Sequence, residues 1–375
     1  MKLPRDHHMK FVVLREALLK PLQLVAGVVE RRQTLPVLSN VLIVLNGDQL
    51  SLTGTDLEVE IVGRVQLSQA GESGEITVPA RKLVDICRSL QDGANIEFFQ
   101  EDHRIIVKSG RSRFTLSTLP AADFPNVEDT PGNLRFSCAQ QEIKRLIERT
   151  SFAMAQQDVR YYLNGMLWEV RQDQLRVVAT DGHRMAMCTR AVAVTTSDVT
   201  QAILPRKGVL ELLRLLDDST AQVEVTLSAN NIRVTSPDYT FTSKLVDGKF
   251  PEYERVLPRG GNKVVIGSRV ELKQAFGRTA ILSNEKYRGV RFLLSDGLLT
   301  IVANNPEQEE AEEQVVVDYT GDSLEVGFNV SYLQDVTNVI NHENIKITLS
   351  DSNSSALLED PDNGDSLYVV MPMRL

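Results

Sequence analysis

Two hydrophobic periods alternate along this chain. Over most of its length apolar residues recur at every second position, as in half-buried β-strands, with turn dipeptides such as Asn46-Gly47 and Asp296-Gly297 between the runs. At intervals the period lengthens to that of a helix with one apolar face. Strands that alternate in this way, with two such helices beside them, predict an α+β module of antiparallel sheet carrying both helices on one face.

The module occurs three times, because four landmarks recur in one order about 125 residues apart. They are an apolar run before the first helix, a polar corner after a strand, the start of the second helix, and the first residue of a closing strand. In that order the residues are Phe11, Phe136 and Val264; Asp56, Asp181 and Asn305; Pro79, Pro205 and Asn329; and Phe114, Phe241 and Tyr368.

Chain-breaking residues mark the joints between the repeats, at 130–133 and 257–262. We therefore predict three domains, 9–130, 131–259 and 260–375. Residues 1–8 precede a second Met and match nothing in the other repeats, so we interpret them as an extension or a cloning remnant that takes no part in the fold.

Composition narrows the class of protein. Hydrophobic residues make up 42% of the chain, enough for a core in each repeat. No segment approaches the ~18 consecutive apolar residues of a membrane span, so we expect a soluble, cytoplasmic protein without a membrane partner. Cys87, Cys138 and Cys188 are odd in number and form no CxxC pair, which predicts buried thiols rather than disulfides or a zinc site.

The net charge of −9 would by itself argue against a nucleic-acid partner. The predicted helical stretches nevertheless sum to +5 and leave −14 on the rest; they are 15–32, 81–90, 142–149, 206–218, 268–286 and 330–343. A positive helical surface on an acidic body is expected of a protein that holds a phosphate backbone on one face. A simple preference of basic residues for helices would give the same count.

No pattern predicts catalysis, a metal ion or a cofactor. The sequence lacks the GxSxG, Walker and GxGxxG motifs, and the histidines at positions 7, 8, 103, 183 and 342 have no metal-binding or nucleophile spacing. Asp181 and His183 are the one catalytic candidate, but they occupy the corner that Asp56 and Asn305 occupy in the other repeats. We therefore predict a structural role for them and a protein that is not an enzyme. A hydrolase site across domain junctions is a distant alternative.

Two charged patches of opposite sign lie in different repeats. The basic patch contains Lys108, Arg111 and Arg113, and the acidic patch contains Glu307, Glu309, Glu310 and Glu313. Each could be a solvated surface. Alternatively, complementary patches at opposite ends of a repeat chain predict a head-to-tail contact between two copies, which closes into a ring where the geometry allows.

Seven segments resemble the bacterial sliding clamp family, the beta subunits of DNA polymerase III. They are LTGTDLE (52–58), RSRFTLSTLP (111–120), QDVRYYLNGM (157–166), ATDGHR (179–184), FTSKLVDGKFP (241–251), ILSNEK (281–286) and YVVMPMRL (368–375). The resemblance extends from Met9 to Leu375. It implies a homodimeric ring of six similar domains, lined by twelve helices, that encloses double-stranded DNA without reading its sequence.

The resemblance also implies the partners of such a ring. A replicative polymerase subunit, a clamp loader, repair polymerases and mismatch-repair proteins would bind through short peptide motifs, so that the ring confers processivity. The implied DNA contacts are Arg32, Gln157, Tyr161, Tyr162 and Lys207. Taken as residues alone, Tyr161 and Tyr162 could instead form a core aromatic pair. Glu30 stands beside the Arg32 loop where most family members have Gly.

The second implied site is a peptide pocket where repeats two and three meet. Its chemistry suits an extended segment with hydrophobic anchors, since Met adapts its shape and Arg pairs with carboxylates. From the pattern alone the run that begins at Tyr368 reads as a buried strand, so part of the set is structural. Met185 replaces the family's usual Leu and conserves volume. The implied lining is Leu163, Thr180, Gly182, His183, Arg184, Met185, Pro251, Arg255, Val256, Ser355, Val369, Val370, Met371, Pro372, Met373, Arg374 and Leu375.

For the dimer interface, the resemblance implies contact between Phe114 and Leu116 on one copy and Ile281 and Leu282 on the other, flanked by the two charged patches. Apolar contact is expected to supply most of the affinity, because exposed ion pairs add little. The main alternative from another class is a peptide-docking scaffold that never encircles DNA.

Overall fold

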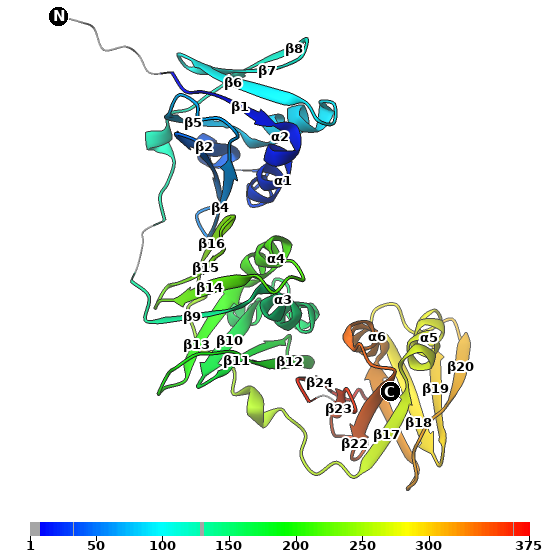
Figure 1. Ribbon diagram of the computed structural model, residues 1–375. Helices are drawn as coiled ribbons and strands as arrows, with labels where there is room; N and C mark the ends of the chain where they lie inside the picture. Colours follow the sequence, from blue (N-terminus) through cyan, green and yellow to red (C-terminus); the bar gives the residue numbers. More distant parts are fainter. Residues whose placement is uncertain (1–7, 33, 128–130, 363) are drawn as a thin grey trace, which may run out of the picture. The chain divides into compact units, whose positions relative to one another are not determined.

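The computed structural model describes residues 8–32, 34–127, 131–362 and 364–375 (Figure 1). Apart from His8, the predicted extension at 1–8 lies outside the described residues, and so does the predicted boundary at residue 130. Two compact units make up the chain. The first contains the residues up to Gln141 together with Leu210–Leu245, and the second contains Glu142–Val209 and Val246–Leu375. Each unit holds one eight-stranded and one four-stranded sheet, and all their strand pairs are antiparallel, as predicted.

The first unit combines the opening repeat with part of the second. Its eight-stranded sheet has the order β5 (Gly74–Pro79), β2 (Asn40–Asn46), β3 (Gln49–Thr55), β4 (Val59–Gln66), β16 (Tyr239–Lys244), β15 (Asn231–Thr235), β14 (Gln222–Leu227) and β9 (Leu134–Ala139). Its four-stranded sheet has the order β1 (Lys10–Leu14), β6 (Asn95–Glu101), β7 (Arg104–Ser109) and β8 (Ser112–Ser117). Helices α1 (Arg15–Ala26) and α2 (Ala80–Ser89) pack together, and α1 lies on β3 and β4.

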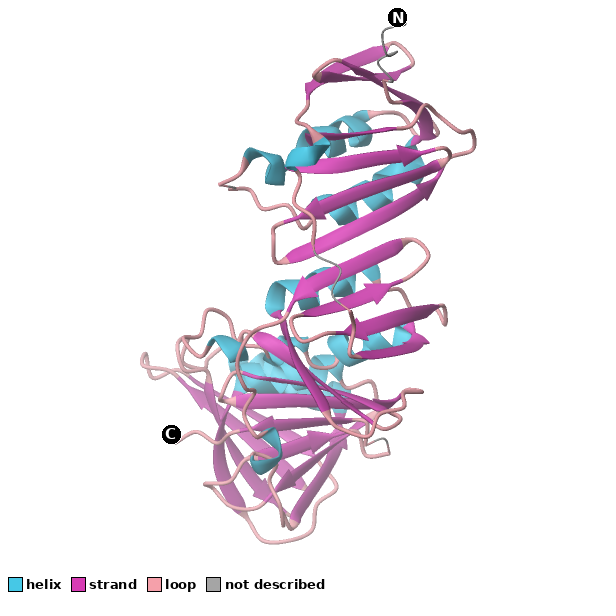
Figure 2. Ribbon diagram, turned by 90° about the vertical axis from the view of Figure 1, so that its left-hand side faces the viewer, coloured by secondary structure: helices cyan, strands magenta, loops and turns pink. Residues whose placement is uncertain are grey.

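The second unit repeats this plan. Its eight-stranded sheet has the order β13 (Thr200–Pro205), β10 (Gly165–Arg171), β11 (Gln174–Thr180), β12 (Arg184–Ala191), β24 (Ser366–Val370), β23 (Ala356–Glu359), β22 (Asn344–Leu349) and β17 (Lys263–Ser268). Its four-stranded sheet has the order β20 (Glu310–Val316), β19 (Leu298–Asn304), β18 (Gly289–Ser295) and β21 (Leu324–Asn329). Helices α5 (Arg269–Ala280) and α6 (Val330–Val339) pack together, with α5 on β19 and β20 and α6 beside β21 (Figure 1). In the upper part of Figure 2, where the elements are seen separately, helices lie along one face of the strands. Helices α3 (Gln140–Glu148) and α4 (Arg206–Leu215) belong to the second repeat.

The closing strand of one repeat pairs with a strand of the repeat before it. In the first unit Phe241 of β16 lies opposite Ile61 of β4, and in the second unit Tyr368 of β24 lies opposite Ala186 of β12. This pairing makes each large sheet continuous across two repeats. The closing strand of the first repeat, β8, ends its four-stranded sheet, and β20 ends the other.

Burial follows the sequence pattern. In α1 the residues Leu18, Leu22 and Val25 face the sheet and are buried, whereas Lys20 is exposed. The helix ends at Ala26 and not at residue 32 as predicted, because Val28 and Val29 turn inward and are buried in the core. The three cysteines are buried, as predicted. No helix in the described ranges is long and apolar enough to cross a membrane.

Candidate functional site

A tight polar corner joins β11 to β12 and is built by side chains that bind backbone. The Asp181 carboxylate accepts hydrogen bonds from the backbone N–H groups of His183 (2.9 Å) and Arg184 (3.1 Å). Gly182 has φ +87°, a conformation that favours glycine. The corner after β3 is built in the same way, since Asp56 accepts from Glu58 (2.9 Å) and Val59 (2.7 Å). The structural role predicted for Asp181 is thus the role it has here.

Arg184 crosses from this corner to the third repeat. Its guanidinium donates to Asp181 (3.1 Å), to Asp335 of α6 (2.7 Å) and to the carbonyl of Phe152 (3.1 Å). It also lies 4.5 Å from the centre of the Tyr332 ring, within range of a cation–π contact. Since only 13% of this side chain is exposed, the ion pairs are shielded from water and Arg184 is held in one position.

A loop before β10 forms a second wall. The Asn164 side chain clamps it by accepting from the Asp158 N–H and donating to the Asp158 carbonyl, both at 2.9 Å. Arg160 is held by its ion pair with Asp158, which lowers the pKa of that carboxyl. Gln157 has φ +53° at the tip of the loop. The loop therefore presents fixed side chains to solvent and to the corner.

A third wall comes from the segment between β16 and β17, which a polar network holds on the sheet. Glu169 is only 2% exposed, and it accepts hydrogen bonds from Tyr253 (2.8 Å), Gln201 (2.7 Å) and Arg171 (3.0 Å). Burial opposes its ionisation, but these three donors outweigh burial and lower the pKa of Glu169. Phe250 and Tyr253 are buried in a cluster with β10, β11 and β24.

These walls enclose a pocket of about 190 Å³ whose lining is mainly apolar. Eight of the predicted pocket residues line it, together with two that were not predicted for it, Arg160 and Tyr162. The eight are Leu163, Thr180, Gly182, Arg184, Pro251, Val256, Val369 and Met371. Arg160 and Tyr162 both stand in the segment 157–166 that carries the family resemblance, so the signal was present. A small apolar pocket with two arginines at its wall suits a hydrophobic side chain on a chain that also bears an acid.

The structure places the other predicted residues around the pocket or away from it. Met185 and Val370 are buried in the strands beneath it, and the exposed His183 accepts the N–H of Met371 through its carbonyl (3.1 Å). Arg255 lines a separate groove beside Glu169, and Ser355 is half-buried just before β23. Pro372 is half-buried after β24. Met373, Arg374 and Leu375 line another groove, on the third repeat.

The predicted DNA contacts lie in loops and at a helix start. Arg32 is exposed after α1, and Gln157 is exposed on the clamped loop. Tyr161 is 56% exposed and meets Tyr162 edge to face at 5.7 Å. Lys207 lies in the first turn of α4. Tyr161 is thus not a core residue, whereas Tyr162 is half-buried in the pocket wall.

The predicted interface residues lie on or beside the two end strands. Arg111 and Arg113 are exposed at β8, Phe114 is half-buried and Leu116 is buried, while Lys108 is exposed on β7. Ile281 is 76% exposed after α5, and Leu282 is half-buried. In the acidic patch Glu307 and Glu310 are exposed, Glu309 accepts from Asn305 (3.0 Å), and Glu313 pairs with Arg278 of its own chain. The acidic patch is therefore partly neutralised by its own chain.

Comparison with protein families finds three matches in chain order. The domains of the DNA polymerase III beta subunit match at residues 9–128 (N-terminal domain), 137–252 (central domain) and 254–374 (C-terminal domain). Together they span nearly the whole chain.

Individual proteins agree with these matches. The beta sliding clamp of Pseudomonas aeruginosa is 67% identical over 98% of this chain and 100% of its own length, and that of Escherichia coli is 55% identical over the same shares. Among solved structures, a Pseudomonas aeruginosa sliding clamp bound to griselimycin superposes with a TM-score of 0.96 at 67% identity, covering 98% of this chain and 100% of the other. The Caulobacter crescentus clamp, 38% identical, gives 0.94 over 99% and 100%.

Proposed function

Since the chain belongs to the DNA polymerase III beta subunit family, we propose that two copies close into a ring around duplex DNA and tether the replicative polymerase to it. The observation that carries this proposal is the match of three family domains along one chain. A clamp of this kind acts by topology and is not an enzyme. We place it in the cytoplasm, where bacterial DNA is replicated.

Ring closure is supported by the two end strands. Each repeat has a closing strand, and two of the three closing strands already pair within the chain, β16 with β4 and β24 with β12. The strand equivalent to β4 and β12 in the third repeat is β20, and the remaining closing strand is β8. Pairing β20 with β8 of a second copy would therefore continue the same pattern and satisfy both edges.

The repeat also predicts the register of that pairing. In the first unit Phe241 lies opposite Ile61, which pairs on its other side with Gly54. In the second unit Tyr368 lies opposite Ala186, which pairs on its other side with Ala179. The equivalent of these two small residues in the third repeat is Ala303, which pairs with Ala311. We therefore place Phe114 of one copy opposite Ala311 of the other, which sets Arg113 opposite Glu312.

We propose that DNA is contacted by side chains that bind the phosphate backbone only loosely, so that the DNA can move past them. These are Arg32, Gln157, Tyr161, Tyr162 and Lys207, together with exposed cations on the helices, Lys20, Arg81, Lys82 and Lys273. Long, mobile cations attract phosphate while leaving the ring free to slide. Affinity for DNA should consequently fall steeply with salt.

The pocket beside Arg184 is assigned to partner peptides. Its apolar lining from Leu163, Val256 and Val369 would receive the hydrophobic anchors of a short motif, and Arg160 and Arg184 lie at hand for an acidic group. The expected owners of such motifs are the replicative polymerase subunit, the clamp loader, repair polymerases and mismatch-repair proteins.

A topological experiment separates a clamp from a scaffold. The protein is loaded onto nicked circular DNA with a clamp loader, and half of the sample is then cut once with a restriction enzyme. A clamp stays on the circle and slides off the linear DNA, whereas a peptide-docking scaffold gives equal retention on both. Equal retention would exclude the encircling function.

A further inference from the structure

Each repeat contains the same backbone bond just after its closing strand. Leu119 donates to Thr77 (3.2 Å), Val246 donates to Ile203 (2.9 Å) and Met373 donates to Gly327 (2.7 Å). The acceptors all lie in the strand that leads into the second helix. The chain therefore reaches an equivalent point on the sheet in all three repeats.

In the first two repeats a Phe-Pro pair follows this bond. It is Phe124-Pro125 in the first repeat and Phe250-Pro251 in the second, and both aromatic rings are 4% exposed. Phe250 packs in one cluster with Ile203, Leu167 and Val178. These three residues lie opposite one another on three adjacent strands, β13, β10 and β11. The chain thus covers this part of its own sheet with a phenylalanine.

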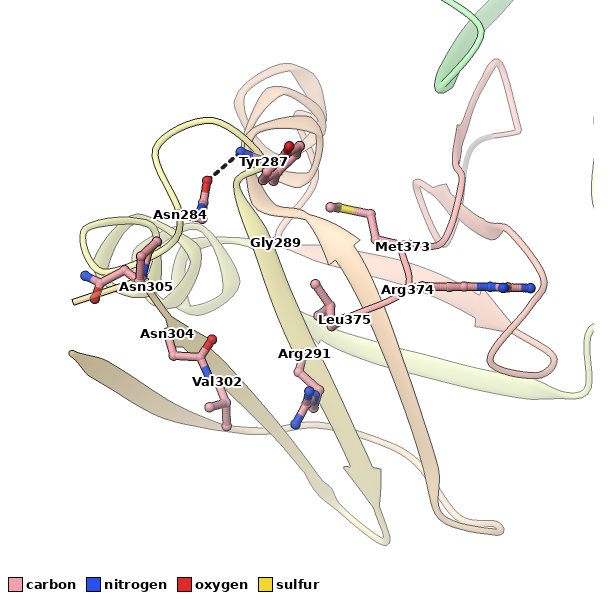
Figure 3. Close-up of a pocket in the computed structure, with 11 residues that line it drawn as sticks. Asn284, Tyr287, Gly289, Arg291, Val302, Asn304, Asn305, Met373, Arg374 and Leu375 are labelled. Atoms are coloured by element: carbon pink, nitrogen blue, oxygen red, sulfur yellow. Dashed lines mark hydrogen bonds between the residues drawn. The ribbon is translucent and has the colours of Figure 1, made fainter. Parts of the chain in front are cut away.

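The equivalent surface in the third repeat is an open groove. Gly327, Arg291 and Val302 lie opposite one another on β21, β18 and β19, each 124 residues after its counterpart in the second repeat. Here the sheet face lines a groove of about 530 Å³. In Figure 3 Leu375 lies on β18 between Gly289 and Arg291, and Arg374 points away. Among the described residues that line this groove, Tyr287 is the one aromatic side chain, whereas in the second repeat Phe250 packs directly with Leu167 and Val178.

Leu375 covers only the part of this surface where Gly289 and Gly327 have no side chains. A Cβ atom added to Gly289 or Gly327 would lie 2.6 or 2.7 Å from its side chain, so the leucine rests directly on them. The groove beyond it is lined by Val302, Asn304 and Tyr287, besides Arg291. Val302 offers apolar contact, and the Arg291 guanidinium can stack on an aromatic face.

We propose that this groove is a second peptide site, distinct from the pocket beside Arg184, and that it binds an aromatic–proline pair of another polypeptide in the place that Phe250-Pro251 takes in the second repeat. Proline suits the site because it holds the segment extended and reduces the entropy lost on binding. The aromatic ring supplies most of the affinity through burial against Val302 and Arg291.

The probe for this site is a labelled peptide with the sequence of residues 247–253, DGKFPEY, titrated into the full-length protein by fluorescence anisotropy. We expect saturable binding that weakens at least about tenfold when the peptide's Phe is replaced by Ala, since burying one aromatic ring is worth that much. Val302→Glu should weaken it similarly, while Val256→Glu in the pocket beside Arg184 should leave it unchanged.

A matched pair of extended proteins keeps the test independent of folding defects. Lys-Phe-Pro appended after Leu375 places a Phe two residues beyond Leu375, as Phe250 stands two beyond Gly248, and should block the probe. Lys-Ala-Pro appended at the same point should not. Absence of saturable binding, equal binding to the Val302→Glu protein, or equal blocking by the two extensions would overturn the proposal.

Discussion

At the scale of single residues, Arg184 determines the shape of the pocket. Its guanidinium joins Asp181 of the corner to Asp335 of α6 and to the Phe152 carbonyl. Ion pairs this well shielded are strongly affected by loss of one partner, because the remaining carboxylates stay partly buried without a counter-charge.

We therefore expect Arg184→Ala to lower the free energy of unfolding by about 2–3 kcal/mol and to weaken binding of a partner peptide. Denaturant unfolding and peptide titration measure the two effects. Arg160→Ala is the matched control, because Arg160 lines the same pocket but is exposed and should change stability little. Equal stability of the Arg184→Ala and wild-type proteins would contradict the assignment.

The buried carboxylate of Glu169 should make the stability of the protein depend on pH in the acid range. Its pKa is lowered in the folded protein from the usual 4.5, so its contribution to stability is complete above that value and is lost as the pH falls through the folded pKa. Glu169→Gln should cost about 1–2 kcal/mol at neutral pH through weaker hydrogen bonds, and the deficit should shrink on acidification. Urea unfolding at several pH values between about 3 and 7 measures both the deficit at neutral pH and its change in acid. A deficit that stays constant over this range would refute the role of the carboxylate.

The role of a single residue can be predicted from the sequence where a short local motif determines its position. The corner from Thr180 to Arg184 is predictable because an equivalent corner recurs in the other repeats, and the structure shows that its side chains bind their own backbone. The positions of the C-terminal residues from Val369 to Leu375 are harder to predict from the sequence. Val369 and Met371 line the pocket, but Met373 bonds to Gly327 on the third repeat and leads Leu375 into another groove. Which of these residues line the pocket and which line the other groove depends on pairing between distant strands, and this pairing cannot be read from the residue types alone.

Among the elements, the end strands β8 and β20 are the ones that we propose to pair when two copies assemble. Both have exposed charged residues, of opposite sign, which protect an open sheet edge from random pairing while favouring the correct partner. The register that we propose from the repeat places Arg113 of one copy opposite Glu312 of the other.

A disulfide tests this register. With Arg113→Cys and Glu312→Cys in one chain, mild oxidation should give a covalent dimer on a denaturing gel, because paired residues on adjacent strands come within reach of a disulfide. Arg113→Cys with Gln314→Cys is the control, displaced by two residues, and should cross-link far less. The native cysteines are buried and should stay reduced. Preferential cross-linking of the control would show a shifted register.

Elements were predicted well where the pattern was periodic and poorly at their ends. The six α-helices in the described part of the chain and the closing strands follow from apolar periodicity. However, α1 ends six residues before the predicted residue 32, because burial of Val28 and Val29 outweighs helix propensity. The division into 9–130, 131–259 and 260–375 stays a prediction.

At the level of the whole molecule, the proposed dimer interface includes apolar residues that lie outside the strands. Ile281 is 76% exposed in a single chain, unusual for an aliphatic side chain, and Leu282 stands beside it. We expect Ile281→Ala with Leu282→Ala to give a monomer at micromolar concentration in sedimentation velocity, because two lost apolar anchors cost about 2–4 kcal/mol at each interface. Tyr287→Ala, which removes another exposed side chain after α5, is the control and should stay dimeric. A dimer from the double variant would contradict the assignment.

A covalently closed ring shows whether two copies enclose DNA. The Arg113→Cys, Glu312→Cys protein is loaded onto nicked circular DNA, oxidised, and then treated with detergent at a concentration that removes non-covalently bound protein. We expect the cross-linked dimer to remain linked to the circle in detergent and to be released when the DNA is cut once. Release of the cross-linked dimer from the intact circle would contradict it.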